Sequence, residues 1–574
     1  SINTHFRYAI LAPTMINNNQ KKPIMWSISG SDCSGGAGIA ADIKTGHSLG
    51  VEVCTLITAN TVQNSKQLIS VNPVAVDILQ QQVTTLIEDK PPAVIKIGLL
   101  ADNIQVLWLA STLKQLQRKL PQLITVYDPV GQASVGGNFN QLSVLDLAPL
   151  LQQIDVLTPN INEAHFFVSS MIKKETDSLN IAQPYRVKPN ISQLSVKQLA
   201  KRIHQRFAIK SIIIKGGHSK NNHQCIDYCY HQLNQIKQDN QDKCFQAIEY
   251  QLSSPRLKTH YTHGGGCSFA SALASCLAKG YLVRDAFTLA KAFINHGLAA
   301  TQSISAEQQH QYYGAFEQLA WLAILPSEVE SQVCLNELFP TVVDTFNQQH
   351  QNLPAFASLN LQGEKLGLYP VVDSIAWLKR LLPLGLNIIQ LRVKNLAETE
   401  LEQIIIEAIN VAKKYKTRLF INDYWELAIK YNAYGVHIGQ EDLNKADLEK
   451  IQQAGLKLGI STHGCYEFLL AQQLQPSYLA IGAIFPTKTK DMTGQIQGID
   501  NLRQLLALRS KTKKPPIPIV AIGGINLARA PQVLATTVDS IAVVTAITEA
   551  RNPEQAVTEF VALTKHPKLN SDSL

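Results

Sequence analysis

A group of hydroxyl and amine side chains follows an apolar run near the C-terminal end of the chain. The segment FPTKTK occupies residues 485–490 and brings Thr487, Thr489 and Lys490 together on a turn that begins at a proline. Hydroxyls donate hydrogen bonds to phosphate oxygens, and an ammonium group adds a compact positive charge. The segment therefore predicts an anion clamp.

Two pairs of charged residues upstream have the complementary chemistry. Arg392 and Lys394 lie in the segment QLRVK (390–394). A guanidinium group is a planar fork that matches paired phosphate oxygens, while lysine acts as a point charge. Asp423 and Asp442 follow later apolar runs, and carboxylates are ligands for Mg²⁺, which takes the rest of its shell from water and substrate phosphates. These residues predict a site for a diphosphate and Mg²⁺.

The elements that must position these groups form a regular repeat. Between residues 364 and 566, a β-rich apolar run followed by a helical pattern recurs eight times. This predicts a (β/α)8 TIM barrel, whose active sites lie at the C-terminal ends of the strands. A doubly wound open sheet is the alternative, but the polar motifs at the strand ends favour the barrel. The predicted strands are 366–372, 387–391, 418–421, 435–438, 457–460, 478–481, 517–522 and 540–544.

The remaining strand ends also carry groups suited to phosphate. Ser461 ends the fifth strand, Gly524 follows the seventh and Thr545 follows the eighth. Bare backbone amides at a Gly-Gly pair can cradle a phosphate, and the last strands of such barrels often hold one. His437 lies inside an apolar strand, so we expect a packed core histidine. Cys465 has no base partner in the sequence, and we expect it to be structural.

Residues 366–548 resemble thiamine phosphate synthase. The matching segments are YPVVD (369–373), QLRVK (390–394), IND (421–423), VHIGQEDL (436–443), GISTH (459–463), FPTKTK (485–490) and AIGGI (521–525). Members of this family join hydroxymethylpyrimidine diphosphate to thiazole phosphate and release pyrophosphate. The reaction needs stabilisation of the departing anion rather than a general base, so Arg392 and Lys490 are the predicted catalytic residues.

The same resemblance implies the ligands of each substrate. It implies that Asp423 and Asp442 hold Mg²⁺. The residues implied for the pyrimidine diphosphate are Gln390, Leu391, Arg392, Val393, Lys394, Asn422, Ser461 and Lys490. Those implied for the thiazole phosphate are Thr487, Thr489, Gly524, Val544 and Thr545.

The N-terminal half carries a second anion-binding pattern. The segment THGGGCS (262–268) leads into an apolar helical pattern. The amides of Gly264, Gly265 and Gly266 would converge at a helix N-terminus, which attracts anions. Cys267 at the helix start is expected to have a lowered pKa and to act as a base or a polar anchor. A Gly-rich loop beside a small buried cysteine is the alternative.

Other motifs of this half also follow predicted strands. Asn160 and Glu163 are three residues apart and could organise the waters of Mg²⁺. Lys215 ends another strand and could reach the phosphates of ATP. The glycines of SGSDCSGGAG (29–38) allow the backbone to approach a flat ligand closely. Strand-like runs alternating with helical patterns predict a mainly parallel sheet. The predicted strands are 24–28, 93–97, 124–127, 154–157 and 211–214.

Residues 24–300 resemble the ribokinase-like kinases, and specifically the hydroxymethylpyrimidine and hydroxymethylpyrimidine phosphate kinases. Most ribokinase relatives carry a catalytic aspartate at the position of Cys267. A cysteine at this position marks the pyrimidine branch of the family. Gln63 matches the pyrimidine-binding position, with Ala37 and Asp42 in the same region. The chain departs from the family pattern at Cys33, which replaces a proline, and at HGGGCS, which reads HGTGCT in the family. The resemblance implies ATP as a substrate and Mg²⁺ as a cofactor.

The bulk composition sets the frame for these sites. The chain has 574 residues, too many for one core. We predict a ribokinase-like α/β domain over 22–302, a helical segment and linker over 303–363 and a TIM barrel over 364–566. Helical character is expected at 306–324, and residues 1–14 are left out of the fold prediction.

The composition also narrows the possible partners. The apolar fraction is 45%, the charged fraction 17% and the formal charge +8, without a Lys/Arg-rich run. A nucleic-acid partner is therefore not expected. The nine cysteines are scattered, which favours reduced thiols. No apolar run reaches the roughly 18 residues of a membrane helix. We expect a cytoplasmic homo-oligomer that acts on small molecules.

The two halves together predict a bifunctional enzyme of thiamine biosynthesis. The first half would phosphorylate hydroxymethylpyrimidine and its monophosphate with ATP, and the barrel would couple the diphosphate to thiazole phosphate. Two alternatives remain at this point. The kinase could be a pyridoxal kinase, which shares the scaffold. The barrel could be an inactive regulatory module, although Asp423, Asp442 and Lys490 are all present.

Overall fold

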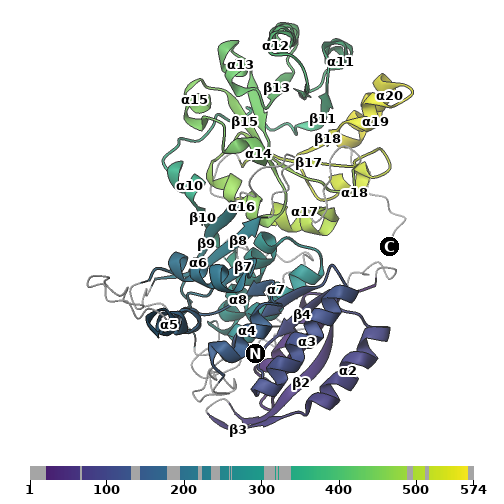
Figure 1. Ribbon diagram of the computed structural model, residues 1–574. Helices are drawn as coiled ribbons and strands as arrows, with labels where there is room; N and C mark the ends of the chain where they lie inside the picture. The colour runs from purple at the N-terminus through teal and green to yellow at the C-terminus, as the bar shows by residue number, and fades with distance from the viewer. Residues whose placement is uncertain are drawn as a thin grey trace, which may run out of the picture.

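The computed structural model contains an open sheet covered by helices and a separate closed barrel (Figure 1). We call them the sheet domain and the barrel. The residues that the structure describes are 21–64, 67–130, 142–177, 194–217, 223–233, 246–257, 259, 262–302, 317–318, 321, 338–487, 496–510 and 516–565.

The sheet domain has ten strands in the order β10-β9-β8-β7-β6-β5-β4-β1-β2-β3. Its central pairs are parallel, and the pairs toward both edges are antiparallel. The strands are β1 (Ile24–Asp32), β2 (Glu52–Gln63), β3 (Leu68–Pro73), β4 (Val94–Ile97), β5 (Ile124–Tyr127), β6 (Val156–Leu157), β7 (Ser211–Ile214), β8 (Gln224–Leu233), β9 (Gln246–Pro255) and β10 (Thr341–Asp344). The five predicted strands correspond to β1, β4, β5, β6 and β7, and the mainly parallel sheet is confirmed.

Helices line both faces of this sheet. They are α1 (Gly38–Ser48), α2 (Val76–Asp89), α3 (Asn103–Lys119), α4 (Val144–Leu151), α5 (Ile161–Asp177), α6 (Val196–Phe207), α7 (Gly265–Ala278), α8 (Val283–Gln302) and α10 (Thr345–Gln349). Helix α7 is almost wholly buried because it carries small and apolar residues on every side. It packs against α1 and α8, so its N-terminal glycines are held in a fixed place.

One expectation for the segment after the sheet domain is wrong. Residues 303–363 are predicted to be a helical segment and linker, but Thr341–Asp344 form strand β10, which pairs antiparallel with β9. The helical pattern at 306–324 lies almost entirely outside the described residues. In the Thr-Val-Val-Asp run Thr341 is exposed, Val342 is buried and the last two residues are half-buried. The chain thus returns to the edge of the first sheet before it enters the barrel.

The barrel is closed by eight parallel strands in sequential order. The strands are β11 (Gly367–Val372), β12 (Ile388–Leu391), β13 (Arg418–Asn422), β14 (Gly435–Ile438), β15 (Lys457–Thr462), β16 (Tyr478–Ile481), β17 (Ile519–Ile522) and β18 (Ser540–Val543). All eight predicted strands are confirmed, and the open-sheet alternative is excluded by the pairing of β11 with β18.

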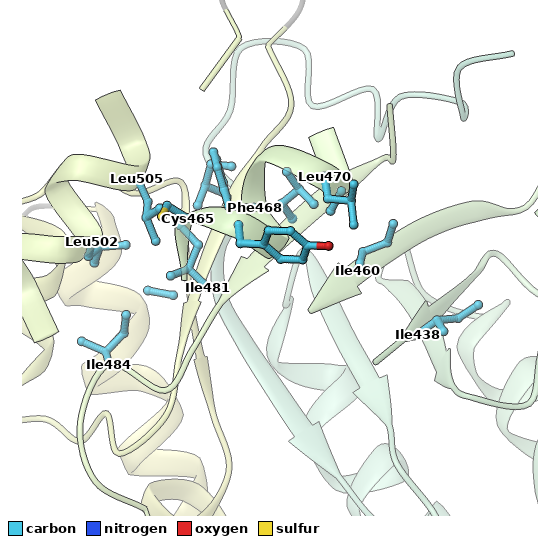
Figure 2. Packing of buried hydrophobic residues seen from close by; sticks show 14 of the residues in the cluster. Ile438, Ile460, Cys465, Phe468, Leu470, Ile481, Ile484, Leu502 and Leu505 are labelled. Atoms are coloured by element: carbon cyan, nitrogen blue, oxygen red, sulfur yellow. The ribbon is translucent and has the colours of Figure 1, made fainter. Parts of the chain in front are cut away.

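Helices surround the barrel and bury its apolar outer surface. They are α11 (Ile375–Leu381), η4 (Leu382–Leu384), α12 (Glu398–Ala412), α13 (Trp425–Lys430), α14 (Gln440–Leu443), α15 (Leu448–Gln453), α16 (Cys465–Gln473), α17 (Gly498–Ala507), α18 (Ala530–Leu534), α19 (Thr545–Thr548) and α20 (Pro553–Lys565). Figure 2 shows buried side chains around α16, where Phe468 and Cys465 belong to the same apolar cluster as Ile460 of β15 and Leu505 of α17.

The two parts share one continuous apolar core. Buried side chains of α7 and α8 belong to the same cluster as those of the barrel helices. Tyr250 of β9 packs edge-on against Tyr466 of α16, with ring centroids 4.7 Å apart. In Figure 1 helices α16 and α17 lie on the side of the barrel that faces the sheet domain. Among the described residues, no helix is both long and apolar enough to cross a bilayer.

Candidate active sites

Strand β12 brings the two predicted cations to one cavity on the barrel. Arg392 and Lys394 project outward and are exposed, while Val393 between them is buried. A cavity of about 640 Å³ opens beside them. Its lining consists of Asp373, Ser374, Ile375, Ala376, Arg392, Val393, Lys394, Leu396 and Ile404. Leu391 and Val393 have buried side chains, and Val393 contributes to the cavity lining.

The two predicted Mg²⁺ ligands lie close enough for the charge of Asp442 to affect the ionisation of Asp423. Burial raises the pKa of Asp423, and the negative charge of Asp442 raises it further. Lys394 Nζ lies 3.9 Å from Asp423 Oδ2, and Lys445 pairs with Asp442 at 2.9 Å. A divalent cation between two repelling carboxylates would relieve this repulsion, so the donor set fits Mg²⁺. Two carboxylates would leave the other coordination positions of Mg²⁺ to water and phosphate.

The glycine loop after β17 lies against the segment that contains the predicted anion clamp. Gly524 has φ +63°, and a Cβ added there would lie 2.7 Å from the carbonyl oxygen of Pro486. Arg529 donates a hydrogen bond to Gly524 O at 2.8 Å and stacks over the Phe485 ring at 4.8 Å. Arg529 thus fastens both segments together, a role that the sequence did not reveal.

The structure describes only some of the residues predicted to hold the thiazole phosphate and the diphosphate. Thr487 is described and half-buried, whereas Thr489 and Lys490 lie outside the described residues. Val544 precedes helix α19, and Thr545 is its exposed first residue.

In the sheet domain, Asp32 joins two glycine segments that are far apart in the sequence. Its carboxylate accepts hydrogen bonds from the amides of Gly36 and Ala37 and lies 2.9 Å from His263 Nε2. Burial opposes ionisation of Asp32, but the hydrogen bonds from His263 and the loop outweigh it and hold its pKa well below the usual range. A Cβ on Gly264, which has φ +83°, would lie 1.8 Å from Gly36 O. The 29–38 and 262–268 segments therefore form one loop cluster.

Gln63 ends strand β2 and carries a buried hydrogen-bond acceptor. Its side chain is 8% exposed, and its Oε1 has no hydrogen-bond partner among the described groups. Buried polar atoms are nearly always satisfied in native proteins. An unpaired amide oxygen beside a glycine-rich loop is therefore suited to receive a donor from a ligand.

Strands β5, β6 and β7 bring the predicted phosphate-binding residues together. Lys215 Nζ pairs with Asp128 Oδ1 at 2.7 Å, and it lies 3.7 Å from the position of a Cβ on Gly266. Asn160 and Glu163 exchange hydrogen bonds of 2.8 and 2.9 Å with each other's backbone amides. Burial raises the pKa of Glu163 to about 7, although the charge of Lys215 opposes the shift. Lys215, the carboxylates and Gly266 therefore lie close together at the ends of these strands.

Comparison with known proteins identifies the families of the two domains that carry these sites. Residues 368–547 match the family model described as thiamine monophosphate synthase, and residues 32–313 match that of phosphomethylpyrimidine kinase. A thiamine-phosphate synthase of Yersinia pestis (strain Pestoides F) is 51% identical over 216 residues, which are 38% of this chain and 97% of that protein. The chain belongs to the thiamine-phosphate synthase family. It also carries a phosphomethylpyrimidine kinase domain, so it is a bifunctional enzyme of thiamine biosynthesis.

Solved structures resemble the kinase half. Pyridoxal kinase from Staphylococcus aureus in complex with pyridoxal is 23% identical and covers 53% of this chain and 96% of its own, with a TM-score of 0.40. Phosphomethylpyrimidine kinase from Clostridium difficile 630 is 25% identical and covers 47% of this chain and 98% of its own, with a TM-score of 0.32. The match to the family model, rather than these likenesses, identifies the pyrimidine kinase and sets aside the pyridoxal kinase alternative.

A chain of hydrogen bonds inside the synthase domain was not foreseen. Gln390 Nε2 donates to Tyr369 Oη at 3.1 Å, and Tyr369 Oη lies 2.7 Å from Tyr478 Oη. His437 Nδ1 lies 2.6 Å from Tyr478 Oη, and its Nε2 lies 2.7 Å from Ser461 Oγ. The chain therefore connects two predicted substrate-binding residues, Gln390 and Ser461, through the barrel interior.

His437 is buried, as expected of a core histidine, but it is also tied to the site. Burial and, to a smaller extent, the charge of Arg392 lower its pKa to about 4. The imidazole is therefore neutral at pH 7, with one nitrogen that donates and one that accepts. The only sequence signal for this role was a histidine in an otherwise apolar strand.

Asp42 lies deeper in the kinase domain than its predicted contact with substrate implies. Its side chain is fully buried, and Lys96 donates to both carboxylate oxygens at 2.9 and 3.0 Å. Ser27 and Ser271 also donate to it. Because the carboxylate is fully engaged, Asp42 holds Lys96 and helix α7 beneath the glycine loop.

The expected lowering of the Cys267 pKa is wrong. Burial raises the pKa of this thiol, and the negative charges of Asp128 and Asp42 add to the rise, while Lys96 opposes it. Desolvation of a thiolate thus outweighs the position at the start of a helix. The thiol is neutral at pH 7, which favours a polar anchor over a general base.

A buried lysine supports the kinase loop that follows β7. Lys291 of α8 is 3% exposed and pairs with Asp227 Oδ2 at 2.8 Å. The other oxygen of Asp227 accepts a hydrogen bond from Gly216 N at 2.7 Å. Gly216 follows Lys215, so this ion pair fixes the loop that presents the predicted phosphate-binding lysine. The sequence signal that could have indicated this ion pair is a lysine within an apolar helical run.

Proposed function

We propose that this chain catalyses three consecutive steps of thiamine biosynthesis. The kinase domain transfers a phosphoryl group from ATP to hydroxymethylpyrimidine and then to its monophosphate. The synthase domain joins the resulting diphosphate to thiazole phosphate and releases pyrophosphate. The observation that carries this proposal is the convergence of Arg392, Lys394, Asp423 and Asp442 at the C-terminal ends of the barrel strands.

In the synthase step, the bond between the pyrimidine methylene and the diphosphate oxygen breaks. The amino-substituted ring supports positive charge on the methylene, and the thiazole nitrogen then bonds to that carbon. Arg392 and Lys394 stabilise the negative charge that develops on the departing diphosphate. When bound by Asp423 and Asp442, Mg²⁺ would supply further charge neutralisation. A neutral His437 keeps Ser461 oriented toward the same ligand.

In the kinase steps, positioning and charge stabilisation are the main requirements. Phosphoryl transfer passes through a loose transition state, so little proton abstraction is needed early in the reaction. The amides of 264–266 and the ammonium of Lys215 would hold the transferred group. The unpaired Gln63 Oε1 would accept a hydrogen bond from the pyrimidine amino group. A protonated Cys267 is compatible with the second phosphorylation, whose acceptor is already an anionic phosphate. In the first phosphorylation, the hydroxyl proton would pass to the transferred phosphoryl group or to water.

Mass spectrometry of the reaction products tests all three steps. The full-length protein is incubated with hydroxymethylpyrimidine, ATP and Mg²⁺, with and without thiazole phosphate. We expect pyrimidine diphosphate without thiazole phosphate and thiamine phosphate with it. Accumulation of the diphosphate in both samples would contradict synthase activity. Arrest at the monophosphate would contradict the second phosphorylation.

A further inference from the structure

Helix α8 of the kinase domain begins at the rim of the synthase active-site face. Helix α16 follows β15, so its N-terminal end lies where the barrel strands end, which is the side of the barrel that carries the site. The first turn of α8 meets this end of α16 directly. Figure 1 places both helices at the junction between the two parts.

Asp285 of the kinase domain accepts a hydrogen bond from a backbone amide at the start of synthase helix α16. Its Oδ1 accepts a hydrogen bond from Tyr466 N at 3.0 Å and lies 3.7 Å from Cys465 Sγ. The residue before the helix, Gly464, provides no side-chain cap. A Cβ on Gly464 would lie 2.5 Å from the Asp285 carboxylate. Asp285 thus takes the place of a helix cap, which normally comes from the helix's own chain segment.

Arg284 holds the same loop through a second contact. Its NH2 lies 2.6 Å from Glu467 Oε1. The other oxygen, Glu467 Oε2, accepts hydrogen bonds from the backbone amide and Nδ1 of His463 at 2.7 and 2.9 Å. Glu467 is 5% exposed, so this ion pair is shielded from solvent. Arg284 therefore fixes His463 by way of Glu467.

The loop held in this way carries a predicted diphosphate-binding residue. Ser461 lies two positions before His463. The synthase domain anchors Ser461 through His437 at its hydroxyl and through Gln440 Nε2 at its carbonyl oxygen, 2.8 Å away. The segment 461–467 is thus held at its start by the barrel and at its end by the kinase domain.

We infer that Arg284 and Asp285 are positioning residues for the synthase reaction, supplied by the kinase domain. They fix the β15–α16 loop so that Ser461 meets the pyrimidine diphosphate in the correct geometry. The inference rests on the proposed role of Ser461. It implies that, in this chain, the docked kinase domain improves the geometry of the synthase site, and that fusion of the two enzymes has a structural consequence for the second reaction.

The test uses full-length variants with the kinase step bypassed. Synthase kinetics are measured with pyrimidine diphosphate, Mg²⁺ and thiazole phosphate for Asp285→Ala, Asp285→Asn and Arg284→Ala. We expect the alanine variants to raise KM for the diphosphate about 5- to 30-fold, because misplaced binding groups lose affinity and rate. KM for thiazole phosphate should stay unchanged. Asp285→Asn should restore most of the loss, since its amide oxygen still accepts from Tyr466 N.

A matched control lies at the other end of the same helix. Gln473 Nε2 donates to Val342 O of β10 at 2.8 Å, so Gln473→Ala breaks a contact to the sheet domain far from Ser461. We expect it to leave KM for the diphosphate unchanged, and an equal loss would overturn the inference. Kinase activity of each sample, expected to be unchanged, reports whether the kinase domain is folded.

Ser461→Ala separates this inference from the function on which it rests. A raised KM for the diphosphate in Ser461→Ala, with normal kinetics in Arg284→Ala and Asp285→Ala, would overturn the inference and leave the proposed function standing. Normal kinetics in Ser461→Ala would instead overturn the proposed role of Ser461. A raised KM in all three variants, with rescue by Asp285→Asn, supports the inference.

Discussion

At the scale of single residues, the unpaired oxygen of Gln63 makes the sharpest prediction for the kinase site. Gln63→Leu keeps the size of the side chain but removes the buried acceptor. We expect KM for hydroxymethylpyrimidine to rise about 10- to 100-fold, since a ligand donor would be left without a partner. Gln67→Leu, an exposed position on the same hairpin, is the control and should have no effect. Equal KM values for Gln63→Leu and the wild type would remove Gln63 from the site.

Cys267 provides a second test at this scale, because its thiol is protonated at neutral pH. We expect Cys267→Ala to reduce kinase kcat by about 10- to 100-fold through loss of a group at the anion hole. Coupling of supplied diphosphate to thiazole phosphate should be unchanged. Product formation is measured separately for each reaction. A parallel loss of both activities would contradict two independent sites.

His437 should make the stability of the synthase domain depend on pH. Its pKa is about 4 in the folded protein, against 6.5 for an ordinary histidine. The unfolded chain therefore binds a proton that the folded chain does not, and stability falls as pH drops from about 6.5 toward 4. The difference in unfolding free energy between wild type and His437→Asn should shrink by about 2 kcal/mol from pH 7 to pH 5. A constant difference in urea unfolding would contradict a neutral, buried imidazole.

At the scale of elements, the Gly524 loop and the Phe485–Thr487 segment act as one unit. Gly524→Ala forces a left-handed residue with a Cβ 2.7 Å from Pro486 O. We expect KM for thiazole phosphate to rise by roughly 10-fold as the two segments separate. Gly455→Ala is the control, because Gly455 also has positive φ but nothing lies within 4 Å of its Cβ position. Both variants should lose stability, and only Gly524→Ala should alter the kinetics.

The elements also explain which parts of the fold could be predicted. The barrel strands are short apolar runs with polar groups at their ends. The sequence therefore predicts both the strands and the ends that carry candidate site residues. Strand β8 reads Gln-Cys-Ile-Asp-Tyr-Cys-Tyr-His-Gln-Leu, and its many polar residues kept it out of the predicted strands. The Asp32–His263 pair and the Asp285 cap join residues 231 and 181 positions apart, which no local pattern can indicate.

At the scale of the whole molecule, helix α8 contacts residues that support the candidate sites of both the kinase and the synthase. Lys291 holds Asp227 beneath the loop of the kinase lysine, and Asp285 holds the start of α16 in the synthase. The two residues lie on one rigid helix, about 9 Å apart along its axis at 1.5 Å per residue. The kinase and synthase sites are therefore connected by structure as well as by sequence.

The limits of the kinase domain follow from the same organisation. Strand β10 completes the sheet beyond β9, and Asn295 of α8 donates to Leu338 O at 2.8 Å. Phe339 and Val342 are buried in the shared core. A fragment that ends at residue 302 lacks these residues and leaves the edge of β9 unpaired, which invites association between chains. A fragment that ends at residue 350 retains them.

We therefore expect fragment 21–350 to be soluble and to phosphorylate hydroxymethylpyrimidine, whereas fragment 21–302 should aggregate. Both fragments expose the α8 surface that faces the synthase, so the comparison isolates the contribution of the segment that contains β10. Size-exclusion chromatography and kinase assays of the two fragments provide the measurement. Equal solubility and activity of both would mean that β10 is dispensable and that the kinase domain ends near residue 302. A higher solubility and activity of fragment 21–350 would assign β10 to the kinase domain. It would show that the edge of β9 must be paired with β10 for the kinase domain to stay soluble.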